Sequence, residues 1–390
     1  MNDMIYRILV GFFCFFSLVT EAQVLRDLNF NHIYPNAVFS FDWKVIKEGN
    51  NFKVYYEGRQ QETGRKLSFS ITLETRGSLT EKSGNPISSP PITNQSENFS
   101  GTVEFQAEAG QAILVAKVTI TGNEKELVYT FYKLLPKDNS LYLQSNQPIQ
   151  LRPYVNTNNA VTFSGFDSNR PLEISYYKTS FPPAAPAFSN TQTKVSKTLK
   201  PDSIFKADPK TPVAFYSKGL YLAQQDTATA VGIAFRAETD YPKLSTIEGL
   251  AGPLIYICTK QEADKLKQVG NDKKKFDQLI LSITGNAERA RTFMRSYFKR
   301  VELANQYFSS YKEGWKTDRG MIYIIFGLPE EVYLFEDREV WEYKNNNAKI
   351  RFQFTRSPSL FDPDNYVLVR DKKFTTPWYE MIDLWRKARF

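Results

Sequence analysis

Apolar and polar residues alternate along much of the first third of the chain. In LSFSITLET, four apolar residues fall on every second position and share one face of a strand: Leu67, Phe69, Ile71 and Leu73. AILVAKVTIT repeats this alternation, and polar, Pro-rich turns separate such stretches. A period of two is typical of half-buried strands. We therefore expect residues 23–137 to form an antiparallel, immunoglobulin-like β-sandwich.

The middle region, residues 138–260, has shorter apolar runs such as LEISYYK and AVGIAF. These runs predict a second β-rich domain, less regular than the first. The stretch SFPPAAPAFSNTQTKVSKTLKPDSIF between them is rich in Pro and polar residues. We expect this stretch to be a surface loop, and a strap that binds a partner is the alternative.

Helical periodicity becomes strong after residue 260. From residue 287 to 312, apolar residues recur at steps of three and four, which predicts one long amphipathic helix. Four apolar stretches follow and predict the strands of an antiparallel meander: MIYIIFG, VWEY, IRFQF and YVLVR. A long helix packed on a four-stranded sheet makes residues 261–390 an α+β domain.

The predicted helix and the first predicted strand are joined by EGWKTDRG, residues 313–320. Gly314 would end the helix in a left-handed conformation, and Trp315 would fold back on the helix. Thr317 and Asp318 would accept hydrogen bonds from nearby backbone amides, and Gly320 would let the chain enter the strand. We interpret these five residues as a structural motif. The alternative makes Asp318 an acid or base, or part of a small binding site.

These residues also carry a resemblance. YFKRVELANQYFSSYKEGWKTDRGMIYIIFGLPEEVY, followed by VWEY, resembles the GWxTD domain family of exported proteins, found chiefly in Bacteroidota. Gly314, Trp315, Thr317 and Asp318 are the pattern for which that family is named. Leu328 departs from it, because similar sequences tend to carry a proline there. The family brings no established activity. The order of elements is also similar to that of small lipoproteins of the outer-membrane barrel-assembly machinery, which implies a protein-binding scaffold.

The N-terminal residues predict export. Arg7 precedes the apolar run ILVGFFCFFSLV, and small residues follow it, so residues 1–22 are expected to be a signal peptide cleaved after Ala22. No later segment approaches the ~20 apolar residues of a membrane-spanning helix. We therefore expect a mature chain without a transmembrane segment, in the periplasm or on the periplasmic face of the outer membrane. The net charge of +8 is spread along the sequence, and we expect no nucleic-acid partner.

The residue inventory restricts catalytic chemistry. His32 is the one histidine, and Cys258 is the one cysteine beyond the predicted signal peptide. We therefore expect no catalytic triad, no zinc site and no cofactor. FDPDN is interpreted as a polar turn, with a calcium site as the alternative. We interpret the carboxylates between residues 330 and 342 as a solvated sheet edge, and hydrolysis of a glycosidic bond is the one catalytic alternative.

The C-terminal stretch TPWYEMIDLWRKARF predicts a helix with Trp378, Ile382 and Trp385 on one face and Arg386 and Arg389 at its end. Such a helix either packs on its own domain or docks a partner or a membrane surface, and we treat these five residues as candidates for partner binding. Our first hypothesis is a non-enzymatic envelope protein that acts through protein contacts in a secretion or outer-membrane assembly complex, with peripheral association to the outer membrane. The alternative is a glycan- or peptidoglycan-binding protein, or a weak carboxylate-based hydrolase.

Overall fold

The computed structural model describes residues 29–34, 38–61, 67–87, 92–94, 97–122, 126–145, 149–178, 180–191, 198–345 and 348–390. The predicted signal peptide, residues 1–22, lies outside them. No helix among the described residues has both the length and the hydropathy needed to cross a membrane. The chain divides into two compact units. Unit 1 comprises residues 1–140 and 330–341, and unit 2 comprises residues 141–329 and 342–390. The predicted division into three domains stays a prediction.

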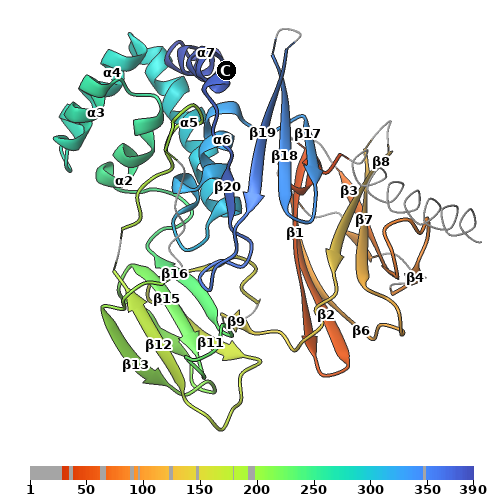
Figure 1. Ribbon diagram of the computed structural model, residues 1–390. Helices are drawn as coiled ribbons and strands as arrows, with labels where there is room; N and C mark the ends of the chain where they lie inside the picture. The colour runs from red at the N-terminus through yellow and green to blue at the C-terminus, as the bar shows by residue number, and fades with distance from the viewer. Residues whose placement is uncertain are drawn as a thin grey trace, which may run out of the picture. The chain divides into compact units, whose positions relative to one another are not determined.

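Unit 1 is built on two antiparallel sheets (Figure 1). The first has the order β1-β2-β6, formed by Phe39–Glu48, Asn51–Gln60 and Asn98–Phe105. The second has the order β4-β3-β7-β8, formed by Asn85–Pro86, Ser68–Arg76, Ile113–Thr121 and Glu126–Leu134, and β5 (Ile92–Asn94) also pairs with β3. The alternating apolar residues of both sheets contribute to one core that includes Phe41, Phe69 and Phe131. This arrangement is sandwich-like.

Two further segments belong to unit 1. The short helix η1 (Asn31–Ile33) precedes β1, and the strand β17 (Glu331–Leu334) comes from late in the chain. The backbone N–H of Phe30 donates to the carbonyl of Val332 at 2.9 Å. Tyr34 donates its hydroxyl hydrogen to the Glu339 carboxylate, which also accepts from the Trp341 indole at 2.6 Å. Residues from the two ends of the sequence therefore complete the same folded unit.

The β-rich part of unit 2 has two sheets. The larger has the order β10-β16-β15-β12-β13, formed by Tyr154–Asn156, Ile233–Glu238, Gly219–Gln224, Leu172–Tyr177 and Ser203–Ala207. The smaller has the order β14-β11-β9, formed by Val213–Ala214, Ala160–Ser164 and Tyr142–Gln144. Phe163, Phe215 and Phe235 are buried in their common core. β10 and β16 run parallel, and the other pairings of the larger sheet are antiparallel.

Helices follow from residue 247 onward. They are α2 (Ile247–Ala251), η2 (Gly252–Tyr256), α3 (Lys260–Lys267), α4 (Lys273–Thr284), α5 (Ala287–Phe308), η3 (Gly314–Lys316) and α6 (Asp318–Phe326). The chain then forms a sheet of order β17-β18-β19-β20, whose later strands are Arg338–Asn345, Ala348–Arg356 and Tyr366–Leu368. It ends with η4 (Lys372–Phe374) and α7 (Thr375–Arg386). The predicted long helix is confirmed as α5, which Asn286 caps by accepting from the Arg289 amide at 2.9 Å.

The strand expected over residues 321–327 is wrong, because residues 321–326 belong to α6 and Gly327 is the C-cap of that helix. The run MIYIIF is buried on every side of the helix, so its apolar residues show no helical stripe. α6 contacts both α5 and β20, and α5 packs against α4, α6 and α7. Of the two helices, α6 is therefore the one with clear contacts to the sheet, and direct packing of the long helix on the sheet stays a prediction. The likeness to barrel-assembly lipoproteins relied on a strand over MIYIIFG. Because this run is helical, that part of the likeness is wrong.

Candidate functional site

The motif of residues 314–320 joins two helices of unit 2. After α5 ends at Phe308, the chain passes through η3 and enters α6 directly. Thr317 is the N-cap of α6: its hydroxyl oxygen accepts from the Gly320 amide at 3.0 Å, and its hydroxyl hydrogen is donated to the Gly314 carbonyl at 2.8 Å. One side chain thus closes the start of α6 and binds η3 to it.

The two glycines of the motif allow backbone segments to touch. A Cβ atom on Gly314 would lie 2.0 Å from the carbonyl oxygen of Ala304 in α5. A Cβ atom on Gly320 would lie 1.9 Å from the carbonyl oxygen of Gly314. Gly314 lies in η3 and is not among the described glycines with positive φ, so the expected left-handed conformation is wrong. Close packing is what requires glycine at both positions.

Trp315 is buried and is held by two elements, α5 and η2. Its backbone N–H donates to the Asn305 side-chain oxygen at 3.0 Å, and its carbonyl accepts from the Tyr256 hydroxyl at 2.9 Å. The indole packs edge to face with the Tyr256 ring and covers Gly252, where a Cβ atom would lie 2.9 Å from the indole. The tryptophan therefore ties α5 to η2.

Asp318 forms a buried ion pair across the unit. Its side chain is 2 % exposed, and it binds the guanidinium of Arg370, whose side chain is fully buried. The same carboxylate accepts from the backbone amide of Leu368 in β20 at 2.9 Å. Asp318 thus has partners about fifty residues downstream, in β20 and directly after it. The carboxylate attaches the first turn of α6 to the end of β20.

Part of the Pro-rich stretch also reaches the motif. Arg370 donates to the carbonyl of Ala185 at 3.0 Å, and the amide of Ala184 donates to the carbonyl of Lys316 at 3.0 Å. The amide of Asp371 donates to the carbonyl of Ala187 at 3.1 Å. We call residues 180–187 the strap. The expectation of a surface loop is wrong for this strap. Its backbone forms hydrogen bonds with the motif and with the segment after β20 of the same chain, and these bonds are not evidence of a partner.

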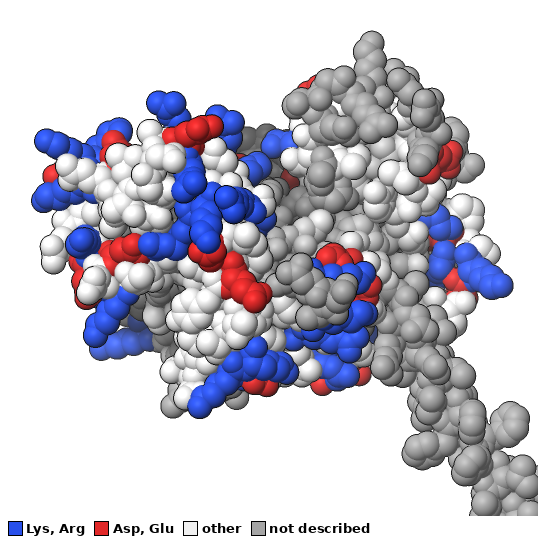
Figure 2. Space-filling model, turned by 90° about the horizontal axis from the view of Figure 1, so that it is seen from above, with Lys and Arg blue, Asp and Glu red and all other residues white. Residues whose placement is uncertain are grey.

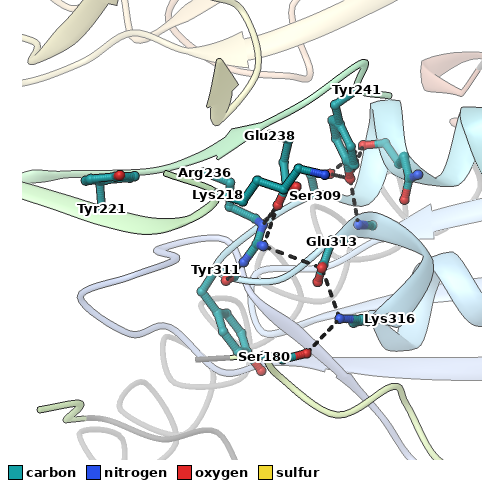
Figure 3. A network of polar contacts seen from close by, with 12 residues as sticks. Ser180, Lys218, Tyr221, Arg236, Glu238, Tyr241, Ser309, Tyr311, Glu313 and Lys316 are labelled. Atoms are coloured by element: carbon teal, nitrogen blue, oxygen red, sulfur yellow. Dashed lines mark hydrogen bonds and ion pairs between the residues drawn. The ribbon is translucent and has the colours of Figure 1, made fainter. Parts of the chain in front are cut away.

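A second polar network lies beside the motif (Figure 3). The Glu313 carboxylate lies between two cations, 2.9 Å from Lys316 Nζ and 3.5 Å from Arg236 Nη2. Arg236 also binds Glu238 in the same strand and donates to the carbonyl of Tyr311 at 3.0 Å. Burial acts to raise the pKa of Glu313, but Arg236 and Lys316 outweigh it, so that pKa is lowered. This network joins β16 to the segment before the motif.

Lys312 stands apart from these pairs. The residue is 5 % exposed, and within the described part of the chain its Nζ atom has no hydrogen bond or ion pair. Burial lowers the pKa of Lys312 to about 8, although the nearby Asp318 acts in the opposite direction. Its Nζ atom lies 5.8 Å from the centre of the Tyr311 ring, and a contact of this kind offsets only part of the cost of burying the charge. Below pH 8 this lysine therefore opposes folding.

Replacing Lys312 with Met is expected to raise the free energy of unfolding at pH 7 by roughly 2 kcal/mol, because it removes this cost. As pH rises from 8 toward 10.5, folded wild type loses the proton while the unfolded chain keeps it, so wild-type stability rises and the difference shrinks. Urea unfolding at pH 7 and pH 10 measures both effects. Lys274→Met, at an exposed position, is the control, and it should change the free energy of unfolding little at either pH. If the gain from Lys312→Met were as large at pH 10 as at pH 7, burial of the charged lysine would not be its cause.

The other sequence-predicted groups are engaged within the fold. His32 Nε2 lies 2.6 Å from the Thr130 carbonyl, and burial lowers its pKa. Burial raises the pKa of Cys258 to about 12, so its thiol stays protonated at neutral pH. The Glu342 carboxylate binds Lys349 at 2.6 Å and Arg351. Among the described residues, no three or more His, Cys, Asp or Glu are placed to hold a metal ion.

The FDPDN stretch forms a turn. The amide of Asp364 donates to the Asp362 carboxylate at 3.0 Å, and the amide of Asp362 donates to the Ser359 carbonyl. Burial raises the pKa of Asp362 to about 6, while the nearby Arg319 limits the rise. The stretch is a polar turn with one partly buried carboxyl group.

In the predicted C-terminal helix, α7, the two indoles are buried. Trp385 donates its indole N–H to the carbonyl of Ile325 at 3.0 Å, and the Trp378 ring lies tilted against the Phe326 ring. Arg386 binds Glu262 at 2.8 Å through two nitrogens. The helix therefore packs on its own unit, the first of the two alternatives. Ile382 is half-buried and Arg389 is exposed, and their role in partner binding stays a prediction.

Sequence reasoning missed several groups that hold the motif. Asn305 is fully buried in α5, where it donates to the Pro242 carbonyl at 2.9 Å and accepts from Trp315. Tyr241 accepts from the Gly314 amide at 3.1 Å. A polar residue within the apolar stripe of α5 is a signal that could have identified Asn305. Nothing local in the sequence identifies Tyr241 or Arg370.

Fold and site together define a class: a β-rich protein with helices in its C-terminal part, organised around a buried Gly-Trp-x-Thr-Asp turn. Residues 219–387 match the family model of the GWxTD domain, and this part of the chain is a GWxTD domain. The match begins at β15, so the domain includes strands that precede the helices. A comparison with curated proteins finds no match.

Proposed function

We propose that this protein is a non-enzymatic, exported component of the cell envelope that acts through contacts with other proteins. The complex that it serves would carry out secretion or outer-membrane assembly, in the periplasm or on the periplasmic face of the outer membrane. We also propose that the sandwich-like part of unit 1 is an immunoglobulin-like module. Export rests on the predicted signal peptide.

One observation carries the non-enzymatic part of the proposal. The carboxylate of Asp318, the acid of the motif, is buried and is bonded to Arg370 and to the Leu368 amide. The hydroxyl of Thr317 both donates and accepts within the motif. A general acid or base has to reach a substrate proton, and neither group is presented for that. Their contacts support a role in holding α6, β20 and the strap together.

Protein contacts have suitable surfaces in both units. β8 is the last strand of its sheet, and its Leu134 is 77 % exposed. β13 is the last strand of the larger sheet in unit 2, and its Ile204 is 53 % exposed. An end strand with exposed apolar side chains can accept a strand from a partner. These two edges are therefore the surfaces at which we expect protein partners.

The proposal is tested by site-specific photocrosslinking in native envelopes. A photoreactive amino acid replaces Leu134 or Ile204, and the exposed Lys210, which lies outside both end strands, provides the control position. A discrete protein adduct from Leu134 or Ile204, absent from Lys210, supports the proposal. Absence of such an adduct, together with a positive glycan-array signal from the purified protein, would overturn it in favour of glycan binding.

A further inference from the structure

Cations gather on the helices α3, α4 and α5 of unit 2. Between residues 260 and 302 the sequence has eleven Lys and Arg but only six Asp and Glu, which accounts for most of the net charge of +8. α4 contacts both α3 and α5, so the three helices form one continuous layer. Figure 2 shows many Lys and Arg side chains over one lobe of the molecule, with fewer acidic ones between them. The charge is therefore more concentrated in the fold than its spread along the sequence suggested.

Most of the acids in this layer already have a cation. Asp264 pairs with Lys267, Asp272 with Lys275, Asp277 with Lys273, and Glu302 with Lys299, while Glu262 pairs with Arg386. Within the described residues, six exposed cations of these helices have no ion pair: Lys260, Lys265, Lys274, Arg289, Arg291 and Arg295. Among the described acids between residues 260 and 302, Glu288 is the one without an ion pair. Local pairing therefore leaves a strongly positive surface.

Helix stability does not explain this distribution. Arg291 and Arg295 are four residues apart on α5, where like charges repel. Lys274, the one lysine of the first turn of α4 that has no ion pair among the described residues, lies where the helix dipole favours acids. Each arrangement costs a few tenths of a kcal/mol in an isolated helix. These cations thus reduce the stability of the helices that carry them. Binding of an anionic ligand would offset this cost.

The surface also carries apolar groups. Leu281 on α4 is 42 % exposed, and Ile255, shortly before α3, is also exposed. Every aromatic residue of α3, α4 and α5 is at least partly buried, so no fully exposed ring is available to stack on nucleic-acid bases. Cations with interspersed aliphatic side chains suit a lipid surface, where phosphate groups meet the cations and apolar groups enter the interface.

We propose that the exposed face of α3, α4 and α5 binds the anionic headgroups of a phospholipid surface and holds the protein at a membrane. The binding is electrostatic and reversible, and it involves no membrane-spanning segment. It goes beyond the proposed protein contacts and does not depend on them. A surface of this kind would give peripheral membrane association a defined location, on elements other than the end strands β8 and β13.

The test is co-sedimentation of the purified protein with vesicles of phosphatidylcholine, with and without phosphatidylglycerol. Wild type is expected to bind only the anionic vesicles, and raised salt should release it. The triple variant Lys274→Gln, Arg291→Gln, Arg295→Gln is expected to lose binding on the order of 100-fold, at about fivefold per cation near the surface. All three side chains are exposed, so the fold should persist, as circular dichroism would verify.

The matched control removes the same charge elsewhere in unit 2, at the exposed residues Lys200, Lys206 and Lys210, all replaced with Gln. It should bind nearly as well as wild type. Equal losses in both triple variants, equal binding to neutral vesicles, or no vesicle binding would each overturn the proposal. Retention on a soluble polyanion such as heparin without vesicle binding would also overturn it, and would assign the surface to a polyanion instead. Only protein and lipid are present, so the result is independent of the crosslinking experiment.

Discussion

Replacing Gly314 with Ala is expected to destabilise the GWxTD domain by at least about 3 kcal/mol, near the upper end for a single substitution. The new Cβ atom would lie 2.0 Å from the Ala304 carbonyl oxygen and 2.6 Å from the Asn305 Cα atom. Both atoms belong to the backbone of α5, so no side-chain rotation can relieve the overlap. Urea unfolding followed by tryptophan fluorescence measures the loss, because Trp315 follows directly in the sequence.

Gly285→Ala provides the comparison. Gly285 ends α4 with a φ of 85°, and an added Cβ atom would meet only Arg289, at 3.9 Å. Its cost is the conformational one of a left-handed residue, about 1–2 kcal/mol. A Gly314→Ala loss no larger than that of Gly285→Ala would show that backbone conformation, rather than contact with α5, requires glycine in the motif.

The residue types of the motif could be interpreted from the sequence, but the reason for Gly314 could not. Glycine at the end of a predicted helix indicates a left-handed cap, and the sequence contains no sign that the backbone of α5 leaves no room for a Cβ atom at this position. Close approach between segments is a tertiary property. The role of Thr317, unlike that of Gly314, could be predicted. A Thr hydroxyl that accepts from an amide three residues later is a local interaction, as its hydrogen bond with Gly320 shows.

The misassigned α6 illustrates a second limit. MIYIIF combines β-branched and aromatic residues, and burial on all sides removes the periodicity that distinguishes a helix from a strand. Thr317 followed by Asp318 is nevertheless a helix-start signal, with a capping hydroxyl and an acid in the first turn. Giving that signal more weight than strand propensity would have predicted the helix. By contrast, α5 retains an exposed face, and its extent was predicted to within four residues at its C-terminal end.

The partners of Asp318 lay beyond sequence reasoning altogether. Arg370 and the strap are distant from the motif in sequence, and both meet it only because α6 and β20 pack together. The positive surface was missed for the same reason: cations spread along three helices become neighbours only when those helices form a layer. Local patterns determined which segments are regular, and tertiary packing determined which charges meet.

Replacing Asp318 with Asn is expected to destabilise the protein by about 3–5 kcal/mol, because it leaves the buried Arg370 guanidinium without a counter-charge. Arg370→Met should cost a similar amount by isolating the carboxylate. The double variant should cost clearly less than the two single losses added together, because neither buried charge remains. Chemical unfolding of the four proteins measures the coupling.

Asp364→Asn is the matched control, since Asp364 pairs with Arg356 at 3.0 Å on the surface and its side chain is 78 % exposed. That loss should stay below about 1 kcal/mol. Envelope crosslinking of Asp318→Asn then separates the two interpretations of the motif. If the acid serves the fold, crosslinked yield falls only in proportion to the folded fraction. A variant as stable as wild type that forms no adduct would instead place Asp318 in a binding site, because only direct contact with a partner removes function while the fold remains.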